Sequence, residues 1–211
     1  MNIFGIYSKY MIPPNLQEHM IRVATVGNAV SSNWKKDSEV DVARIAKTLL
    51  VHDTGNILFF DFKTFPIENE DHWRKVQTLF REKYGDDHAA VMTIAKEVGL
   101  DDKSLYILDT MPKTDFEHQI PDDQPELQIC WYSDFRVAPY GITTLSKRFD
   151  DLVQRRKKSG YSKNKIQRWI KMKEYGVELE KKLQEKISIQ LNSISENDVN
   201  GFKKKIGEFK Y

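Results

Sequence analysis

Apolar residues recur at spacings of three and four along most of this chain of 211 residues, whereas strict alternation of apolar and polar residues is scarce. This period matches an α-helix that buries one face, so the sequence predicts an all-α fold. Prolines and glycines separate the periodic segments. The predicted helices span residues 15–30, 38–54, 73–84, 86–99, 102–110, 122–137, 144–158 and 162–194, with a loop over 113–122 and a poorly ordered end over 200–211.

Two polar side chains interrupt the apolar faces of these helices. His19 lies three residues after Leu16 and four before Val23, so it belongs to the buried stripe of the first helix. Asp134 shares one side of a later helix with Cys130. A carboxylate on a buried face is costly unless it is paired, hydrogen-bonded or bound to a metal ion. Both positions therefore indicate a polar site within the helical core.

The adjacent pair His52-Asp53, in the segment LLVHDTGN, lies where an apolar helix should end. Neighbouring residues on a helix point about 100° apart, so two adjacent ligands for one ion are easier to arrange where the backbone can turn. Gly55 occupies a position that commonly terminates a helix. We therefore expect both side chains to reach one site from a helix end.

These residues form a mixed imidazole and carboxylate set: His19, His52, Asp53 and Asp134. Such a set suits borderline and hard divalent ions, here Mn, Fe, Co, Ni, Zn or Mg. Four protein donors leave positions of an octahedral ion open for a solvent molecule and for a phosphate oxygen. The set therefore predicts a divalent metal cofactor and the hydrolysis of a phosphate ester.

The order and placement of these four residues resemble the HD superfamily of metal-dependent phosphohydrolases. HDTGN resembles the extended HDIGK form of the family motif, and YSDFRV followed by LSKRFDDL resembles the stretch around the family's last aspartate. The resemblance covers roughly the first 155 residues. It implies a helical bundle with the four ligands in a central cleft, and a nucleotide or related small molecule as substrate. It also implies that Asp53 both binds the ion and orients or deprotonates its water.

Three further residues have candidate roles. Binuclear members of the resembled family add histidines between the HD pair and the last aspartate, which makes His88 a candidate catalytic group. It could bind a second metal or transfer a proton, and a purely hydrogen-bonding role is the alternative. Arg22 and Arg136 each follow a predicted ligand closely and are candidates for binding substrate phosphate, because Asn56 replaces the lysine that often ends the extended motif. Surface salt bridges are the alternative for both arginines.

The composition, 40% hydrophobic and 30% charged, is that of an ordinary soluble domain. No apolar run approaches the roughly 20 residues needed to span a bilayer, and the first residues lack a signal-peptide pattern. The single cysteine, Cys130, excludes an internal disulfide and a cysteine-built zinc site. We therefore expect a cytoplasmic protein with no membrane partner.

The net charge of +2 hides an asymmetry between two parts of the chain. Residues 147–211 hold 18 Lys and Arg against 9 Asp and Glu, a net charge of +9, so the preceding residues carry −7. We predict a phosphohydrolase domain over residues 1–158 and a basic amphipathic helical extension over residues 159–211. A basic region can meet phosphate-rich partners, although a solvated lysine-rich helix face is the simpler interpretation.

The basic extension supports an alternative function. In this interpretation the chain is a catalytically silent HD scaffold that binds RNA, DNA or an acidic protein through its C-terminal region. The long helix over residues 162–194 also places Leu179, Leu183 and Ile187 three or four apart. This stripe fits packing on the core, which we favour, or a homodimer.

Overall fold

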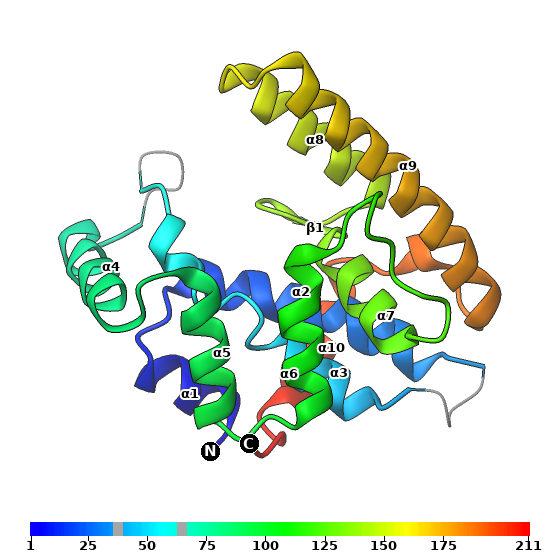
Figure 1. Cartoon of the computed structure of the whole chain (residues 1–211). Helices are drawn as coiled ribbons and strands as arrows, with labels where there is room; N and C mark the ends of the chain where they lie inside the picture. Colours follow the sequence, from blue (N-terminus) through cyan, green and yellow to red (C-terminus); the bar gives the residue numbers. More distant parts are fainter. Residues whose placement is uncertain (36–39, 63–66) are drawn as a thin grey trace.

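Helices account for most of the chain, which confirms the all-α prediction (Figure 1). The structure is a computed structural model and describes residues 1–35, 40–62 and 67–211. Its α-helices are α1 (Ile3–Lys9), α2 (Pro14–Ser32), α3 (Val42–Leu49), α4 (Glu70–Tyr84), α5 (Asp87–Glu97), α6 (Asp102–Thr110), α7 (Pro125–Asp134), α8 (Leu145–Lys158), α9 (Lys163–Lys186) and α10 (Asn197–Ile206). The described chain also contains the 3₁₀ helices η2 (Asn56–Phe59), η3 (Met111–Lys113) and η4 (Leu191–Ser193), and a small antiparallel hairpin of β1 (Val137–Ala138) and β2 (Gly141–Ile142).

Side chains just before the helices explain where several of them begin. The carboxylates of Asp41, Asp86 and Asp101 accept hydrogen bonds from backbone N–H groups three residues on, at the starts of α3, α5 and α6. Such caps satisfy donors that have no partner within the helix. The predicted helix start at Ser38 lies outside the described residues. Pro14 begins α2 without a side-chain cap, since its missing N–H would have no helical partner in any case.

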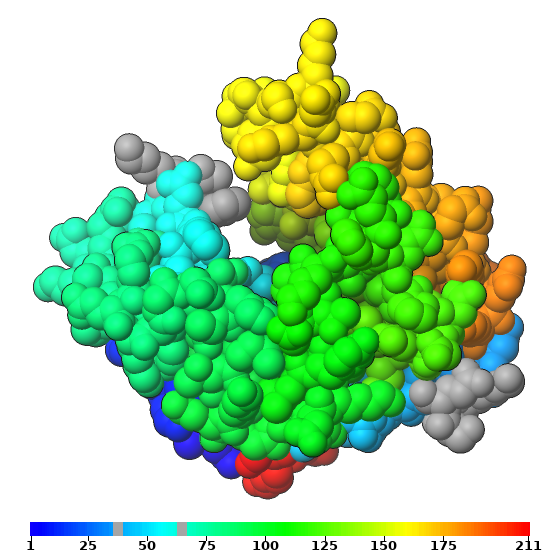
Figure 2. All heavy atoms as spheres, viewed as in Figure 1, coloured from blue at the N-terminus to red at the C-terminus, as the bar shows by residue number. Residues whose placement is uncertain are grey.

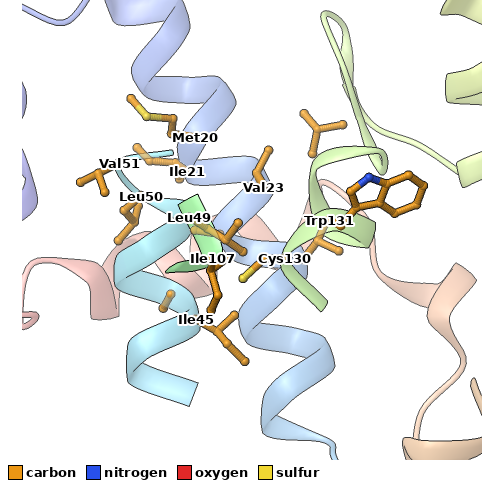
Figure 3. Close-up of a cluster of buried hydrophobic side chains, with 14 of the residues drawn as sticks. Met20, Ile21, Val23, Ile45, Leu49, Leu50, Val51, Ile107, Cys130 and Trp131 are labelled. Atoms are coloured by element: carbon orange, nitrogen blue, oxygen red, sulfur yellow. The ribbon is translucent and has the colours of Figure 1, made fainter. Parts of the chain in front are cut away.

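The centre of the core is the packing of α2, α3 and α7 (Figure 3). Gly27 lies where these three helices meet. A Cβ atom at this position would lie 2.3 Å from Leu49 Cδ1 and 3.2 Å from Ile45 Cγ2 on α3, and 3.4 Å from Ser133 Oγ on α7. The missing side chain of Gly27 therefore permits the close approach of all three helices.

The segment after residue 158 shares this core. Buried side chains from α9, η4 and α10 belong to the same hydrophobic cluster as α2, α3 and α7: Leu179, Leu183, Leu191, Val199, Phe202 and Ile206. The prediction of a poorly ordered end over residues 200–211 is wrong, because α10 is a regular helix that buries Phe202 and Ile206. The backbone N–H of Tyr211 donates to the carbonyl of Met1, so the two termini lie side by side (Figure 1). The division of the chain at residue 158 stays a prediction.

The helix α9 ends at Lys186, earlier than the predicted end at residue 194. Ile187 has an extended backbone and forms an isolated antiparallel β-bridge with Trp34, just after α2. The N–H of Lys35 donates to the carbonyl of Lys186 over 2.9 Å. Pairing with a distant segment therefore replaces the helical hydrogen bonds, although the apolar spacing continues.

The apolar stripe of α9 packs inside the chain, as we favoured. Leu179, Leu183 and Ile187 are all buried in the shared core. A homodimer through these three side chains is therefore wrong, because they are not available to a second copy. The α8–α9 hairpin nevertheless projects beyond the rest of the molecule at its loop (Figure 1). Across the described ranges, no helix combines the length and apolar character needed to cross a bilayer.

The close packing at Gly27 predicts the effect of adding a side chain there. We expect Gly27→Val to lower the free energy of unfolding by about 1–3 kcal/mol, because the new methyl groups overpack the contact with Leu49. Urea unfolding would measure the change. Gly201→Val is the matched control, because a Cβ at Gly201 on α10 meets nothing within 4 Å. Equal stability of the two variants would contradict the proposed role of Gly27.

Candidate metal centre

The structure brings the four predicted ligands together. His19 comes from α2, His52 and Asp53 from the turn after α3, and Asp134 from the last residue of α7. One potential ligand atom from each of these residues lies within 4.8 Å of the other three. We call these residues the four-ligand group.

The imidazole and carboxylate atoms of the four-ligand group face a common centre. His19 Nε2 lies 3.1 Å from Asp53 Oδ2 and 3.5 Å from Asp134 Oδ1. His52 Nε2 lies 3.6 Å from Asp53 Oδ1 and 3.6 Å from Asp134 Oδ1. The two imidazole rings are themselves only 5.6 Å apart between centroids. This arrangement alternates nitrogen and oxygen donors around one point.

The turn after α3 holds the His52 ring in place. The last carbonyls of a helix have no partner within it. Here the carbonyl of Leu49 faces His52 Nδ1 at 2.7 Å. The next two carbonyls accept hydrogen bonds from the hydroxyls of Tyr7, at 2.7 Å, and Thr54, at 2.9 Å. His52 and Thr54 of the segment HDT therefore bond carbonyls at the end of α3 and in the turn after it, and the bond of His52 fixes a predicted ligand.

The hydrogen bond to Leu49 also sets which nitrogen of His52 can bind a cation. A carbonyl only accepts, so Nδ1 carries the hydrogen, and Nε2 of the neutral ring has a free lone pair. The side chain is only 4% exposed, and Nε2 has no hydrogen-bond partner within the described part of the chain. A buried polar atom without a partner is costly. A cation at the centre of the four-ligand group would satisfy it, so these residues fit a divalent metal.

Gly55 serves a different purpose from the predicted one. It has helical φ and ψ values of −82° and −16°, whereas α3 has already ended at Leu49. A Cβ atom at Gly55 would lie 2.1 Å from the carbonyl oxygen of Asp87, in the first turn of α5. The glycine is therefore required for close contact between the HD turn and α5, rather than for ending a helix.

Burial and charge oppose each other in the four-ligand group. Burial alone lowers the pKa of His19, but hydrogen bonds to Asp134 and Asp53 outweigh it and raise this pKa to about 9. Burial alone would raise the pKa of Asp134, and the hydrogen bond from His19 together with the nearby imidazole of His52 instead lowers it. The carboxylates that would attract a metal ion thus also favour protons on the imidazoles. Protons and a metal ion therefore compete for this site.

Two cavities adjoin the four-ligand group from different sides. The larger has a volume of about 450 Å³ and is lined by His52, Asp53 and Asp134, with Trp169 and other residues of α5, α6, α7 and α9. The surface is hollowed where the α8–α9 hairpin faces the rest of the molecule (Figure 2). The smaller cavity, of about 160 Å³, is lined by His19 and by two arginines among its other residues. A substrate could thus contact the site from two directions.

His88 lines the larger cavity but lies outside the four-ligand group. Its Nε2 is 3.0 Å from Asp109 Oδ1, and the other oxygen of this carboxylate pairs with Lys113 Nζ at 2.6 Å. If Nε2 donates to Asp109, Nδ1 of the neutral ring is left as an acceptor. This geometry is compatible with proton transfer, and Lys113 adds a cation to the wall of the same cavity.

The two predicted phosphate-binding arginines have different positions. Arg22 lines the smaller cavity beside His19, although its Nε also pairs with Glu196 at 2.6 Å. Arg136 is only 1% exposed, and its guanidinium donates to the Tyr132 hydroxyl and to three backbone carbonyls, at Thr143, Leu191 and Ile194. The prediction that Arg136 binds substrate is therefore wrong, because its donors all face the interior.

Arg148 is a candidate that the sequence analysis missed. It lines the smaller cavity with His19 and Arg22, its side chain is 15% exposed, and its Nε has no hydrogen-bond partner in the parts of the chain that are described. Burial lowers its pKa, and the nearby carboxylate of Asp134 opposes that shift. The sequence held a signal, since Arg148 lies three residues after Leu145 on the apolar face of its helix.

Comparison with known proteins does not assign a family. No family model matches the chain, and searches of curated proteins and of solved structures found no significant match.

The contrast between the two arginines predicts different effects on stability. We expect Arg136→Met to lower the free energy of unfolding by about 3 kcal/mol or more, because buried carbonyls lose a charged donor. Arg22→Met removes a partly exposed ion pair and should cost at most about 1 kcal/mol. Chemical denaturation of both variants would measure this, and a fully stable Arg136→Met protein would refute the structural role.

Proposed function

We propose that the protein is a divalent-metal-dependent phosphohydrolase that acts on a nucleotide or a related small phosphate ester. One observation carries the proposal: the four-ligand group places two imidazole nitrogens and two carboxylate oxygens within 4.8 Å of one another. The order of these residues along the chain also resembles the HD superfamily. The metal is one of Mn, Fe, Co, Ni, Zn or Mg, all of which accept such donors.

The residues around the centre would divide the work of hydrolysis. A divalent cation held by the four-ligand group would polarise a phosphoryl oxygen and lower the pKa of a water molecule. Asp53 lies between both imidazoles, so it can orient the attacking water and accept its proton. His88, which lines the larger cavity, would give a proton to the leaving oxygen or relay one.

Positive side chains on both sides of the centre favour a phosphate ligand. Arg148 and Arg22 line the smaller cavity beside His19, and Lys113 lines the larger one. Guanidinium groups can bind phosphate oxygens through two parallel hydrogen bonds. Arg148 pairs with Asp151 through Nη1, but its Nε has no partner among the described residues, whereas the Nε of Arg22 already pairs with Glu196. Arg148 is therefore the better candidate.

The larger cavity supports a nucleotide rather than an inorganic substrate. Trp169 and Phe135 form part of its wall, together with acidic and basic side chains. Flat aromatic rings stack on nucleobases, because every base has a π face. We also propose a cytoplasmic location, which fits the single free thiol of Cys130.

Removal of Asp53 tests the function directly. We expect Asp53→Ala to lose both the bound metal and the release of phosphate from nucleotides, since one carboxylate would serve both roles. Elemental analysis and a phosphate assay with added manganese, cobalt or magnesium would measure the two losses. Asp123→Ala, a change of the same kind in an exposed loop position, is the matched control.

The same two measurements can also contradict the proposal. Wild-type protein that binds no divalent ion and hydrolyses no phosphate ester would refute it. We expect one metal ion per chain, because His88 and Asp109 stand apart from the four-ligand group. Two ions per chain, with one lost in His88→Ala, would instead place a second metal at that pair.

Replacing Arg148 should affect catalysis without affecting metal binding. We expect Arg148→Met to keep the metal but to lower kcat/KM by about 100-fold, because a donor to the developing phosphate charge is lost. Steady-state kinetics and elemental analysis would separate the two outcomes. The control is Arg74→Met, which removes an exposed arginine paired with Glu70 on α4. Unchanged kinetics in Arg148→Met would remove this residue from the site.

A further inference from the structure

The positive charge of the C-terminal region is concentrated in one part of the fold. Residues 155–173 contain nine Lys and Arg and no Asp or Glu. They form the end of α8, the connecting loop and the first half of α9. We call this segment the basic tip, and it includes the part of the hairpin that projects furthest from the molecule (Figure 1).

The body of the protein neutralises some of these cations and leaves others exposed. Arg168 pairs with Asp115 and Glu117, and Lys173 pairs with Asp150. The side chains at the end of the hairpin form no ion pair with any described residue: Lys157, Lys158 and Lys163. All three are exposed. The hairpin therefore presents uncompensated positive charge at its end.

Aromatic side chains connect the basic tip to the proposed metal centre. Tyr161 in the loop is 47% exposed, and its ring lies 6.0 Å from the guanidinium of Arg156. The same guanidinium lies 3.6 Å from the centroid of Trp169, over its ring. Trp169 in turn lines the larger cavity with His52 and Asp53. A path of cations and rings thus leads from the end of the hairpin to the four-ligand group.

We propose that the basic tip binds single-stranded nucleic acid and directs one end of the strand into the larger cavity. Exposed cations match a regularly spaced phosphate backbone, and exposed rings match unpaired bases. A cavity of about 450 Å³ has room for one nucleotide at a time rather than a duplex. Tyr161 is the one large apolar side chain exposed among the described residues of the tip, so little is available for insertion into a lipid surface.

The catalytic part of this inference rests on the proposed function, whereas binding by the tip does not. In the reaction, the oxygen of a water molecule forms a bond to the phosphorus of the last phosphodiester link and gives up a proton to Asp53. The phosphorus–oxygen bond to the rest of the strand breaks, and the leaving oxygen takes up a proton. The strand would thereby be shortened from its end. No further reactant is required.

Binding can be measured without turnover by using Asp53→Ala protein. The probe is a short fluorescein-labelled oligothymidylate, and fluorescence anisotropy at several salt concentrations gives its affinity. We expect the added changes Lys157→Glu, Lys158→Glu and Lys163→Glu to weaken binding at least about tenfold and to reduce its salt dependence, because phosphate contacts are lost. The matched control, with Lys204→Glu, Lys205→Glu and Lys210→Glu, reverses three exposed charges near the opposite end of the molecule and should bind like the parent.

Three outcomes would overturn the inference. They are the absence of binding by the parent, equal affinities of the two triple variants, and tighter binding to phosphatidylserine vesicles than to the oligonucleotide. Thermal unfolding checks that the variants fold. Lys163→Glu alone gives a second test, because an acidic residue in the first turn of α9 suits the helix dipole and should not destabilise it. Wild-type protein that binds the oligonucleotide but hydrolyses no phosphate ester would refute the proposed function. Nucleic-acid binding by the basic tip would still stand.

Discussion

The close approach of α2, α3 and α7 at Gly27 is the constraint on which the candidate site depends. The side chains that meet this glycine are also close in sequence to predicted ligands: Leu49 precedes His52 by three residues, and Ser133 immediately precedes Asp134. Any change in the spacing of these helices would therefore change the distances between the imidazoles and the carboxylates. Tight packing in a protein core resists such movement. Core packing thus fixes the distances within the four-ligand group.

The end of α3 shows how one local requirement can serve both folding and chemistry. A helix end needs donors for its last carbonyls, and His52 supplies one of them through Nδ1. The same bond directs Nε2 toward Asp53 and Asp134, and in the neutral ring it leaves the lone pair of Nε2 free for a metal ion. Gly55 then lets α5 pack against this turn, which brings His88 to the wall of the larger cavity. Local hydrogen bonding therefore orients the ligand, and packing places its surroundings.

Helical periodicity was the most informative part of the sequence. A polar residue three after one apolar position and four before the next lies on the helix face that packs against the core, and this rule assigns His19 to that face. Applied to α8, the same rule would have identified Arg148, which lies between Leu145 and Leu152. The prediction for Arg136 failed because α7 ends at Asp134. Beyond the end of a helix, closeness in sequence to Asp134 does not determine where the Arg136 side chain points. Its acceptors at Leu191 and Ile194 are long-range partners that periodicity does not reveal.

The helix α9 lies in three different environments, whereas the sequence analysis assigned all of it to an extension outside the main domain. Its second half packs in the core through Leu179 and Leu183, its middle contributes Trp169 to the larger cavity, and its first turn carries Lys163 at the exposed end of the hairpin. An amphipathic helix that served only to pack on the core would not need the other two contributions. Because α9 is one continuous helix, it connects part of the basic tip directly to the wall of the larger cavity and to the core. Under the proposed function, a strand bound at the tip would therefore reach the cavity along α9, which makes this helix the candidate element for substrate selection.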